Sequence, residues 1–403
     1  NKDCKYIWLL DNDTEIENES LIKLVKVMED DRRIGIAGSM ILNPEMRNLI
    51  VGLGAFVSWK VGAWIPYLRN QRLSDFQKID TVEVDYVAAC SVLVKKEAVL
   101  KVGLMDERYF LHWDDIDFSL RIKESGYKVV AVSSSKVYHG VEKGFNPFLV
   151  YYDIRNGLLT MSKHIKGFNR FFYMLNMTRG SFKKAIFSYL TGQYSIGNLI
   201  LVALLDFIRG NFYKIKSDSP INILIKKRDS GLFSNEIFLS EELKILIFPN
   251  GSFSEIKKLV NMIKSSYNCT LSLLIQSDRK ELFKDLPIDN YIVFESCDQS
   301  SFRTIPILLK IFSSKYDIAI SPNLTLIPFF YAVKKCYLFA TETNKFYKSK
   351  EDLYSFWKLI LAFLAGEALS FCFLPIIYLS SFREKNSWSS NFTSLGLKQN
   401  TKQ

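Results

Sequence analysis

The chain has 403 residues, of which 48% are hydrophobic and 24% charged, so it can bury a sizeable core and is not a disordered polypeptide. Its 53 lysines and arginines exceed its 42 acids, and the resulting charge of +11 favours anionic partners such as phosphate-bearing substrates or a phospholipid surface. No zinc-finger spacing, RNA-binding strand motif or basic helix is present, so nucleic acid is not expected as a partner.

The cysteines and the start of the chain bear on compartment and completeness. Six cysteines are scattered without paired spacing, which is typical of a reduced, cytosolic protein. The first residues carry no signal-peptide pattern. Because the chain begins at Asn1 without an initiating Met and runs straight into a strand, we expect an N-terminally truncated sequence.

The first third of the chain shows strand and helix patterns in turn. Residues 6–10 are a continuous apolar run that ends at Asp11-Asn12-Asp13, which predicts a buried strand of a parallel sheet. A helix is predicted to begin near Ser20, and the next strand covers 34–38. Residues 43–80 show little periodicity but contain several glycines and tryptophans, and they predict a long functional loop.

Regular patterns resume after residue 82. A strand is predicted over 84–94 and a helix over Lys96–Val102. The acidic block Trp113-Asp114-Asp115-Ile116-Asp117 then opens an amphipathic helix. The remaining expected elements of this half are strands at 128–132 and 137–139 and a largely helical stretch over 148–215.

The second half alternates strand-like and helical patterns after a polar linker. Strands are predicted at 245–248, 271–275, 291–294, 318–320 and 336–339, and helices at 253–265, 302–313 and 326–335. This alternation predicts a Rossmann-like parallel sheet. Its phosphate-loop candidate, Pro249-Asn250-Gly251-Ser252, is too short to be specific.

Residues 359–382 form an almost uninterrupted apolar run, long enough to span a membrane, which takes about 20 residues. Glu367 and Pro375 favour the alternative of a buried or interfacial helix. Basic residues lie on both sides of the run, so its orientation cannot be derived from charge. The tail after Asn386 is polar and expected to be disordered.

Three groups of residues carry possible chemistry. Asp11 and Asp13, at the end of a strand, can hold a divalent cation, although an Asp-X-Asp triplet also fits an ordinary turn. The block 113–117 fits helix capping equally well, but its clustered carboxylates repel one another and raise at least one pKa, as a general base requires. His139 follows a strand and can complete a cation's coordination, whereas His112 and His164 are interpreted as surface or core residues.

Together these groups resemble the family 2 glycosyltransferases of the GT-A fold, from about Tyr6 to Asn156 and more loosely to Gly210. The segment Val84-Asp85-Tyr86, followed by 103–110, resembles the family's acceptor side, and 114–121 resembles its acidic catalytic motif. Tyr151-Tyr152 and Arg155-Asn156 resemble a signature of rhamnosyl- and galactofuranosyltransferase-like members, and Trp113-Asp114-Asp115 with His139 favours the galactofuranosyl branch.

The resemblance implies a role for each matching residue. Asp11, Asp13 and His139 would bind Mn²⁺ or Mg²⁺, and Asp11, Asp13 and Arg155 would bind the donor diphosphate. A structural ion pair is the alternative for Arg155. Asp115 would be the general base and Asp114 would orient the acceptor, which Trp113, Asp85 and Asp117 would help to bind. Ala88 and Ala89 depart from the family, which commonly has Gly there, and the nucleobase-binding units that precede the Asp-X-Asp strand in the family are not in this sequence.

The sequence therefore predicts an inverting, metal-dependent transferase that moves a sugar from a UDP- or dTDP-linked donor to a glycan or polyprenyl-linked acceptor. We expect it in the cytoplasm, peripheral to or anchored in an anionic cytoplasmic membrane. The expected parts are a GT-A catalytic domain over 1–145, a helical extension over 146–215, a linker over 216–240, a Rossmann-like domain over 241–345, an apolar helix over 352–383 and a tail over 386–403. A silent membrane-associated scaffold is the main alternative, and a metal-dependent phosphatase or nucleotidyltransferase is a third.

Overall fold

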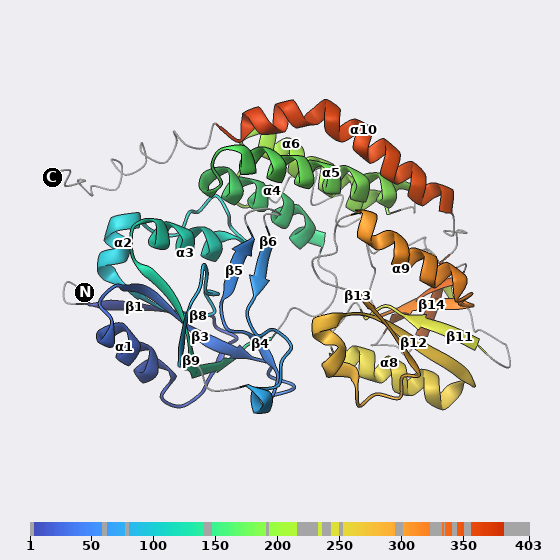
Figure 1. The fold of residues 1–403 in the computed structure, drawn as a ribbon, viewed down its shortest axis with the longest axis horizontal. Helices are drawn as coiled ribbons and strands as arrows, with labels where there is room; N and C mark the ends of the chain where they lie inside the picture. Colours follow the sequence, from blue (N-terminus) through green and yellow to red (C-terminus); the bar gives the residue numbers. More distant parts are fainter. Residues whose placement is uncertain are drawn as a thin grey trace.

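The computed structural model describes residues 4–58, 63–76, 80–140, 147–190, 193–215, 233–235, 243–249, 253–294, 301–322, 333, 335–340, 345–349 and 356–382. These residues form a mixed α/β protein with two seven-stranded sheets and a two-stranded ribbon. Figure 1 shows the two large sheets side by side beneath a layer of long helices.

The first sheet is mixed in strand direction. Its strands are β1 (Tyr6–Leu10), β2 (Glu15–Ile16), β3 (Ile34–Leu42), β4 (Ile50–Gly52), β7 (Thr81–Glu83), β8 (Ser91–Lys95) and β9 (Lys128–Tyr138). The main order is β1-β8-β3-β9-β2, with β4 beside β3 and β7 beside β9. Within the described strands of this sheet only β3 and β9 pair in parallel, and the other neighbours are antiparallel.

The prediction of a buried parallel strand over residues 6–10 is wrong in both respects. β1 pairs antiparallel with β8 at the edge of the described sheet, and Ile7 and Leu10 are 36% and 38% exposed. Apolar runs identify strands, but they do not specify a strand's direction or neighbour. The predicted strand over 34–38 is confirmed and extends to Leu42, and the two pieces predicted over 128–139 form the single strand β9.

The prediction of one strand over 84–94 is also wrong. The ladder on β8 begins only at Ser91, because the chain at Asp85 and Tyr86 hydrogen-bonds away from the sheet. Both backbone N–H groups donate to the carbonyl of Ala55, at 3.0 and 3.2 Å respectively. These contacts fix the chain between β7 and β8 as an irregular segment beside the acidic helix.

The expected long loop over 43–80 contains short regular elements instead. They are β4, the antiparallel ribbon of β5 (Ala55–Ser58) and β6 (Ala63–Pro66), and the 3₁₀ helix η1 (Leu73–Asp75). Trp59 and Gly62, part of the pattern behind that prediction, lie outside the described residues. Strands of three or four residues are too short to show a period in the sequence.

Helices cover both faces of the first sheet. Leu24 and Met28 of α1 (Ser20–Asp30) are buried on one face with Ala37 and Val130. Helices α2 (Lys96–Val102) and α3 (Asp114–Glu124) cover the opposite face, where Ala98, Val102, Phe118 and Ile122 join the core. The predicted helices at Ser20, at Lys96–Val102 and after the acidic block are therefore confirmed.

Four long helices form the layer that Figure 1 shows above the sheets: α4 (Pro147–His164), α5 (Phe168–Leu190), α6 (Tyr194–Arg209) and α10 (Phe356–Ser380). The first three confirm the helical prediction for 148–215, and α10 corresponds to the predicted apolar helix. A Cβ on Gly366 of α10 would come within 2.9 Å of the Lys183 backbone, so α10 lies directly against α5. Glu367 fixes that contact through hydrogen bonds of 2.6 Å from Arg179.

The second sheet has a parallel core. Its elements are β10 (Phe233–Asn235), β11 (Leu243–Ile247), α8 (Phe253–Ser266), β12 (Cys269–Gln276), η2 (Ser277–Phe283), β13 (Asn290–Phe294), α9 (Ser301–Ser313), β14 (Ile318–Ser321), β15 (Lys335–Ala340) and β16 (Lys345–Ser349). The order is β10-β16-β15-β14-β11-β12-β13, parallel from β15 to β13 and antiparallel at β16 and β10.

The five predicted strands of this half and the helices α8 and α9 are confirmed, whereas β10 and β16 were not predicted. Most of the helix predicted over 326–335 lies outside the described residues, and β15 begins at Lys335. The phosphate-loop candidate also lies outside them, apart from Pro249. Phe187 of α5 and Ala362 of α10 share an apolar cluster with Leu246 and Leu274, so the helical layer packs directly on this sheet.

Candidate active site

Three side chains that can bind a cation meet where β1 and β9 end. Asp11 and Asp13 lie in the turn after β1, and His139 is the first residue after β9. Their ligand atoms lie within 4.8 Å of one another, and His139 Nδ1 is 3.5 Å from Asp13 Oδ1. The Thr14 hydroxyl is 3.2 Å from the same imidazole nitrogen. The structure thus brings together all three residues that the sequence predicted as ligands.

The donor set fits a hard divalent cation. Carboxylate oxygens suit Mg²⁺ and Mn²⁺, and a neutral imidazole nitrogen is an additional ligand that Mn²⁺ accepts. Asp13 has 71% of its side chain exposed, so a bound ion would also be open to oxygens of a substrate or of water. Three protein ligands leave about half of a six-coordinate shell for such oxygens.

The acidic pair lies in the first turn of α3. Asp115 accepts hydrogen bonds from the N–H of Ile116 at 2.8 Å and, more weakly, from the N–H of Ala89 at 3.4 Å. Burial, reinforced by the neighbouring charge of Asp114, raises the pKa of Asp115 to about 7. Burial also raises the pKa of Asp114. Asp115 therefore has the proton affinity that a general base needs near neutral pH.

The cation ligands and the acidic pair border the same two residues, Ala89 and Cys90. The carbonyl of Cys90 accepts the N–H of Asp11 at 3.1 Å, while the N–H of Ala89 points at Asp115. Burial and then the negative charges of Asp11 and Asp115 raise the pKa of the Cys90 thiol to about 12. Both carboxylates therefore lie close enough to Cys90 to act on it. No motif in the sequence identified these two residues as the link.

The loop that precedes α3 has a strained backbone. Phe110, His112 and Trp113 have positive φ angles of 61°, 60° and 71°, a conformation that costs a non-glycine residue about 1–3 kcal/mol. The side-chain amide of Asn156 offsets this cost by donating to the carbonyls of Tyr109, Leu111 and His112, at 2.9, 2.7 and 3.0 Å. Asn156 is thus a positioning residue for the acidic turn, a role that its motif did not reveal.

Arg155 does not contact a diphosphate site in this structure. Its side chain is 1% exposed and donates to the carbonyls of Arg108, Tyr109 and Tyr213. The guanidinium group donates to protein atoms throughout, so the structure gives no support to the predicted contact with the donor diphosphate, which stays a prediction. The alternative of a structural ion pair is not seen either, because the partners of Arg155 among the described residues are carbonyl and side-chain oxygens and not an acid.

Two residues predicted to bind the acceptor are likewise engaged inside the protein. Asp117 is fully buried and accepts hydrogen bonds from Arg121 at 2.8 Å and His164 at 3.0 Å, and it pairs with Lys163. Burial by itself would raise the pKa of Asp117, but these cations outweigh burial and hold its pKa well below the usual range. A carboxylate buried and paired in this way does not reach an acceptor, so the structure gives no support to the predicted contact, which stays a prediction.

Asp85 uses both of its carboxylate oxygens to join neighbouring elements. One accepts the N–H of Val57 at 2.8 Å and the other the ammonium of Lys123 at 2.7 Å, which fixes β5 to α3. An acceptor contact would compete with these bonds, so the structure favours a structural part for Asp85. Trp113 is half-buried with its ring near Gly157 of α4, and its predicted contact with an acceptor sugar stays a prediction.

The other two histidines agree with their interpretation. His164 is buried, donating to or accepting from Asp117 and Glu124 at 3.0 and 2.9 Å. Burial would lower the pKa of His164, but these two acids raise it above its usual value. His112 is exposed and lies 2.9 Å from Asp153.

Comparison with known proteins finds sequence similarity to curated glycosyltransferases over part of the chain. No family model matches it. The galactofuranosyltransferase of Mycobacterium tuberculosis is 20% identical over 226 residues, which cover 52% of this chain and 35% of that protein. The N-acetylglucosaminyl-diphospho-decaprenol L-rhamnosyltransferase of Mycobacterium tuberculosis is 31% identical over 121 residues, covering 27% of this chain and 38% of that protein.

The galactofuranosyltransferase of Mycolicibacterium smegmatis is 22% identical over 227 residues, covering 52% of this chain and 34% of that protein. A crystal structure of GalNAc-T7 with UDP, GalNAc and Mn²⁺ aligns at 18% identity and a TM-score of 0.34, over 43% of this chain and 34% of that one. A score this low establishes no common fold.

The chain is thus a distant homologue of family 2 glycosyltransferases, and the resemblance derived from the motifs is confirmed. Its curated relatives include both galactofuranosyl- and rhamnosyltransferases, and the alignments span between 34% and 38% of their lengths.

Proposed function

We propose that this chain carries the catalytic and acceptor-side part of an inverting, metal-dependent glycosyltransferase. It moves a sugar from a UDP- or dTDP-linked donor to a glycan or polyprenyl-linked acceptor in cell-surface polysaccharide synthesis. The observation that supports this function best is the arrangement around Ala89 and Cys90. A carboxylate with a pKa of about 7 lies on one side, and a group of cation ligands lies on the other.

Asp115 is the general base of the proposed reaction. Its carboxylate takes the proton of the acceptor hydroxyl as that oxygen attacks the anomeric carbon, and a single attack of this kind inverts the anomeric centre. The neighbouring Asp114 keeps the pKa of Asp115 high and is placed to orient the acceptor. A base within hydrogen-bonding reach contributes about 10²–10⁴-fold to the rate.

Asp11, Asp13 and His139 would hold Mn²⁺ or Mg²⁺ at the donor side. When bound, the cation supplies charge neutralisation for the diphosphate and for the departing nucleotide. Thr14 positions the imidazole through its hydroxyl, and Cys90 holds the turn through the N–H of Asp11. The shared GT-A architecture of the first 145 residues belongs to the same proposal.

Replacing Asp115 by Asn tests the function directly. We expect Asp115→Asn to lower transfer by the complete protein about 10²–10⁴-fold, because the amide cannot accept the hydroxyl proton. Binding of Mn²⁺ and of the nucleotide-sugar, measured by calorimetry, stays within about threefold of the parent, since the cation ligands are intact. Asp30→Asn, an exposed acid at the end of α1, is the matched control. Preserved turnover in Asp115→Asn contradicts the proposal.

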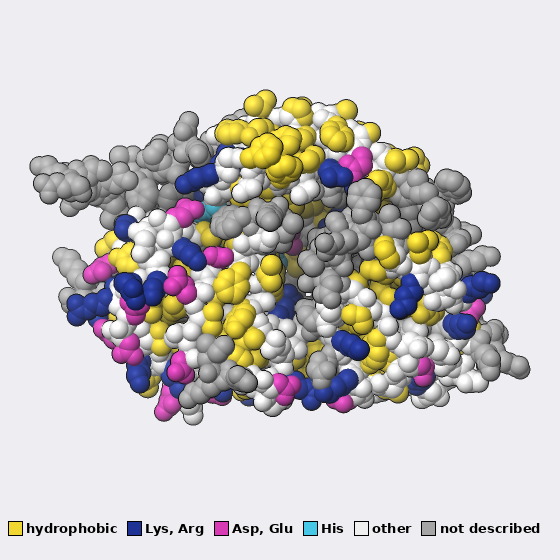
Figure 2. Space-filling view, in the orientation of Figure 1, with side chains coloured by type: hydrophobic (Ala, Val, Ile, Leu, Met, Phe, Trp, Pro, Cys, Tyr) yellow, Lys and Arg dark blue, Asp and Glu magenta, His cyan; other side chains and the backbone are white. Residues whose placement is uncertain are grey.

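The proposed enzyme works at an anionic membrane surface, against which α10 lies. Residues Leu361–Ser380 have a mean hydropathy of 1.8, and 28% of this segment is buried inside the protein. Because Gly366 and Glu367 bind the inner side of α10 to α5, the helix is better suited to lie in the interface than to cross the bilayer. Figure 2 shows an apolar patch over α10, and its exposed side chains include Leu361, Leu364, Leu369, Phe371, Ile376 and Leu379.

Charged substitutions on this surface test the membrane contact. We expect Leu364→Glu/Phe371→Glu/Leu379→Glu to reduce sedimentation with vesicles that contain anionic lipid by about tenfold or more, because each glutamate removes apolar contact and adds repulsion. Ile22→Glu/Leu100→Glu, at exposed positions on α1 and α2, is the control for added charge. Equal loss in the control, or no loss in the α10 variant, contradicts a lipid-facing α10.

A further inference from the structure

On one face of the second sheet, the side chains change from apolar to polar along the strands. In β11, β12 and β13 the odd-numbered residues pack against α8, whereas Leu246, Leu274 and Ile292 face α9 in a separate apolar cluster. The same alternation puts Lys244, Thr270, Ser272 and Asn290 on the α9 side, nearer the amino ends of the strands. The face is thus apolar beneath α9 and polar where that helix ends.

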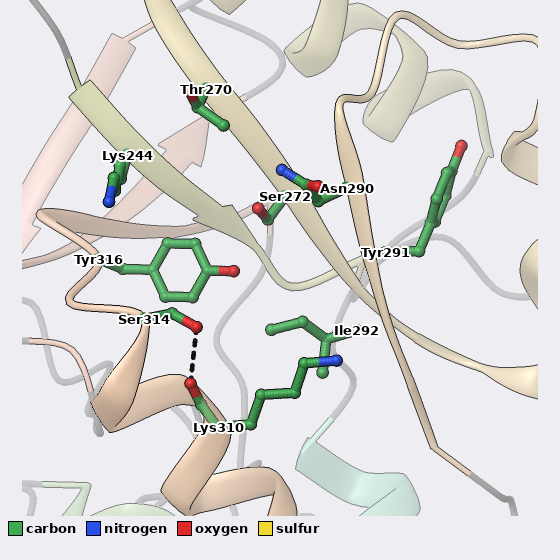
Figure 3. Close-up of a pocket in the computed structure, with 9 residues that line it drawn as sticks. All are labelled: Lys244, Thr270, Ser272, Asn290, Tyr291, Ile292, Lys310, Ser314 and Tyr316. Atoms are coloured by element: carbon green, nitrogen blue, oxygen red, sulfur yellow. Dashed lines mark hydrogen bonds between the residues drawn. The ribbon is translucent and has the colours of Figure 1, made fainter.

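A pocket of about 340 Å³ opens over this polar half of the face. Lys310, Ser314 and Tyr316, from the end of α9 and the turn after it, form its other side. Figure 3 shows side chains from the strands and from this turn around one space, with the hydroxyl groups of Ser272 and Tyr316 in its middle. A pocket of this size is large enough for a single sugar unit.

Three polar groups of the pocket have no side-chain partner within the part of the chain that the structure describes. Neither the ammonium of Lys244 nor that of Lys310 forms an ion pair or hydrogen bond there. The hydroxyl of Ser272 likewise has none, although the residue is only 1% exposed. The hydroxyl is open to the pocket and not sealed from water, so water or a ligand in the pocket can satisfy it.

The acids beside the pocket do not neutralise its lysines. The carboxylate of Asp317 accepts the backbone N–H of Lys244 at 2.8 Å. Asp289 accepts the N–H of Leu271 and the ammonium of Lys264, both at 2.6 Å. The carbonyl of Lys310, at the negative end of α9, accepts the hydroxyls of Ser313 and Ser314 at 3.0 and 2.7 Å. The two lysines therefore give the pocket a positive charge.

We propose that this pocket binds a monosaccharide unit that carries an anionic group, either a phosphate or a carboxylate. The lysines match the anion, while the hydroxyls and the amide of Asn290 match the many donors and acceptors of a sugar ring. The ring of Tyr316 offers flat apolar surface for a ring face. An apolar ligand does not fit, because Ile292 is the one aliphatic side chain among the pocket residues. The site is separate from the candidate active site and is independent of transfer activity.

Ligand-observed NMR on the full chain tests this site with glucose 1-phosphate, glucuronate, glucose and inorganic phosphate as probes. EDTA is present, so that no cation supports donor binding at Asp11, Asp13 and His139. We expect glucose 1-phosphate or glucuronate to bind with a Kd of the order of 1 mM, and the tighter of the two identifies the preferred anion. Lys244→Ala/Lys310→Ala weakens that binding by about tenfold or more.

The control Lys257→Ala/Lys258→Ala removes the same charge from exposed positions on α8, against the opposite face of the sheet, and leaves binding unchanged. Circular dichroism checks that both variants fold. The proposal is overturned if neither anionic sugar binds, or if the control weakens binding as much as the pocket variant. It is also overturned if inorganic phosphate or neutral glucose binds as tightly as the anionic sugars, because then one half of the recognition is missing.

Discussion

The first turn of α3 contains three aspartates in two environments, and their pKa values shift in opposite directions. Asp114 and Asp115 lie at the candidate active site, where burial raises both pKa values and the charge of Asp114 raises that of Asp115 further. Asp117, two residues further along, points into the core, where Lys163, Arg121 and His164 overcome the effect of burial and hold its pKa low. Asp115 can therefore accept a proton near neutral pH, whereas Asp117 stays ionised.

The comparison shows that neighbouring cations determine whether the pKa of a buried carboxyl group is raised or lowered. Burial is the largest influence on both Asp115 and Asp117, and it acts in the same direction on each. Only Asp117 has cations in contact, and they come mostly from the end of α4. Pairs of carboxylates with diverging pKa values are how acid and base roles are separated in a single site.

Breaking the buried side has the largest expected effect. Asp117→Ala leaves Lys163, Arg121 and His164 without their shared anion, so we expect the free energy of unfolding to fall by about 3–5 kcal/mol. Urea denaturation measures this loss. The exposed control Asp30→Ala changes the free energy by less than about 0.5 kcal/mol. A comparable, small effect for Asp117→Ala would show that the cluster is not a structural anchor.

The pH dependence of transfer tests the raised pKa of Asp115. A general base must be ionised to accept a proton, and the pKa of Asp115 is about 7. We therefore expect kcat/KM to level off above pH 7 and to fall towards tenfold per pH unit below it, or about 50-fold between pH 7 and pH 5. A steady-state profile of the complete protein measures this. A flat profile down to pH 5 would remove Asp115 from the proton transfer.

The smallest expected effect is a gain in stability. The folded protein raises the pKa of Asp115 above the 3.8 that is usual for an aspartate, so ionisation of this group opposes folding. The penalty is absent below about pH 4, grows as the pH rises towards 7 and is complete above it. At pH 8, Asp115→Asn should therefore raise the free energy of unfolding, measured by urea denaturation, by on the order of 1 kcal/mol. At pH 4 the substitution should give no such gain. A loss of stability at pH 8 would contradict the raised pKa.

Local patterns predicted the helices well and the strands less well. The helix Lys96–Val102, the helix after the acidic block and the helical stretch over 148–215 follow from local sequence patterns, which act over neighbouring positions. The single strand predicted over 84–94 failed, because hydrogen bonds from Asp85 and Tyr86 to Ala55 take the chain out of the ladder. That contact joins segments about thirty positions apart, and no local pattern contains it.

The sequence by itself determined which residues could do chemistry: acids at a strand end, an acidic helix start and a histidine after a strand. Only the tertiary structure decided which of them meet. It brought Asp11, Asp13 and His139 within 4.8 Å of one another, and it separated Asp115 from Asp117 by packing His164, 47 positions further along, against the latter. Both residues are aspartates, but the pKa of each carboxyl group is set by the neighbours that folding brings to it.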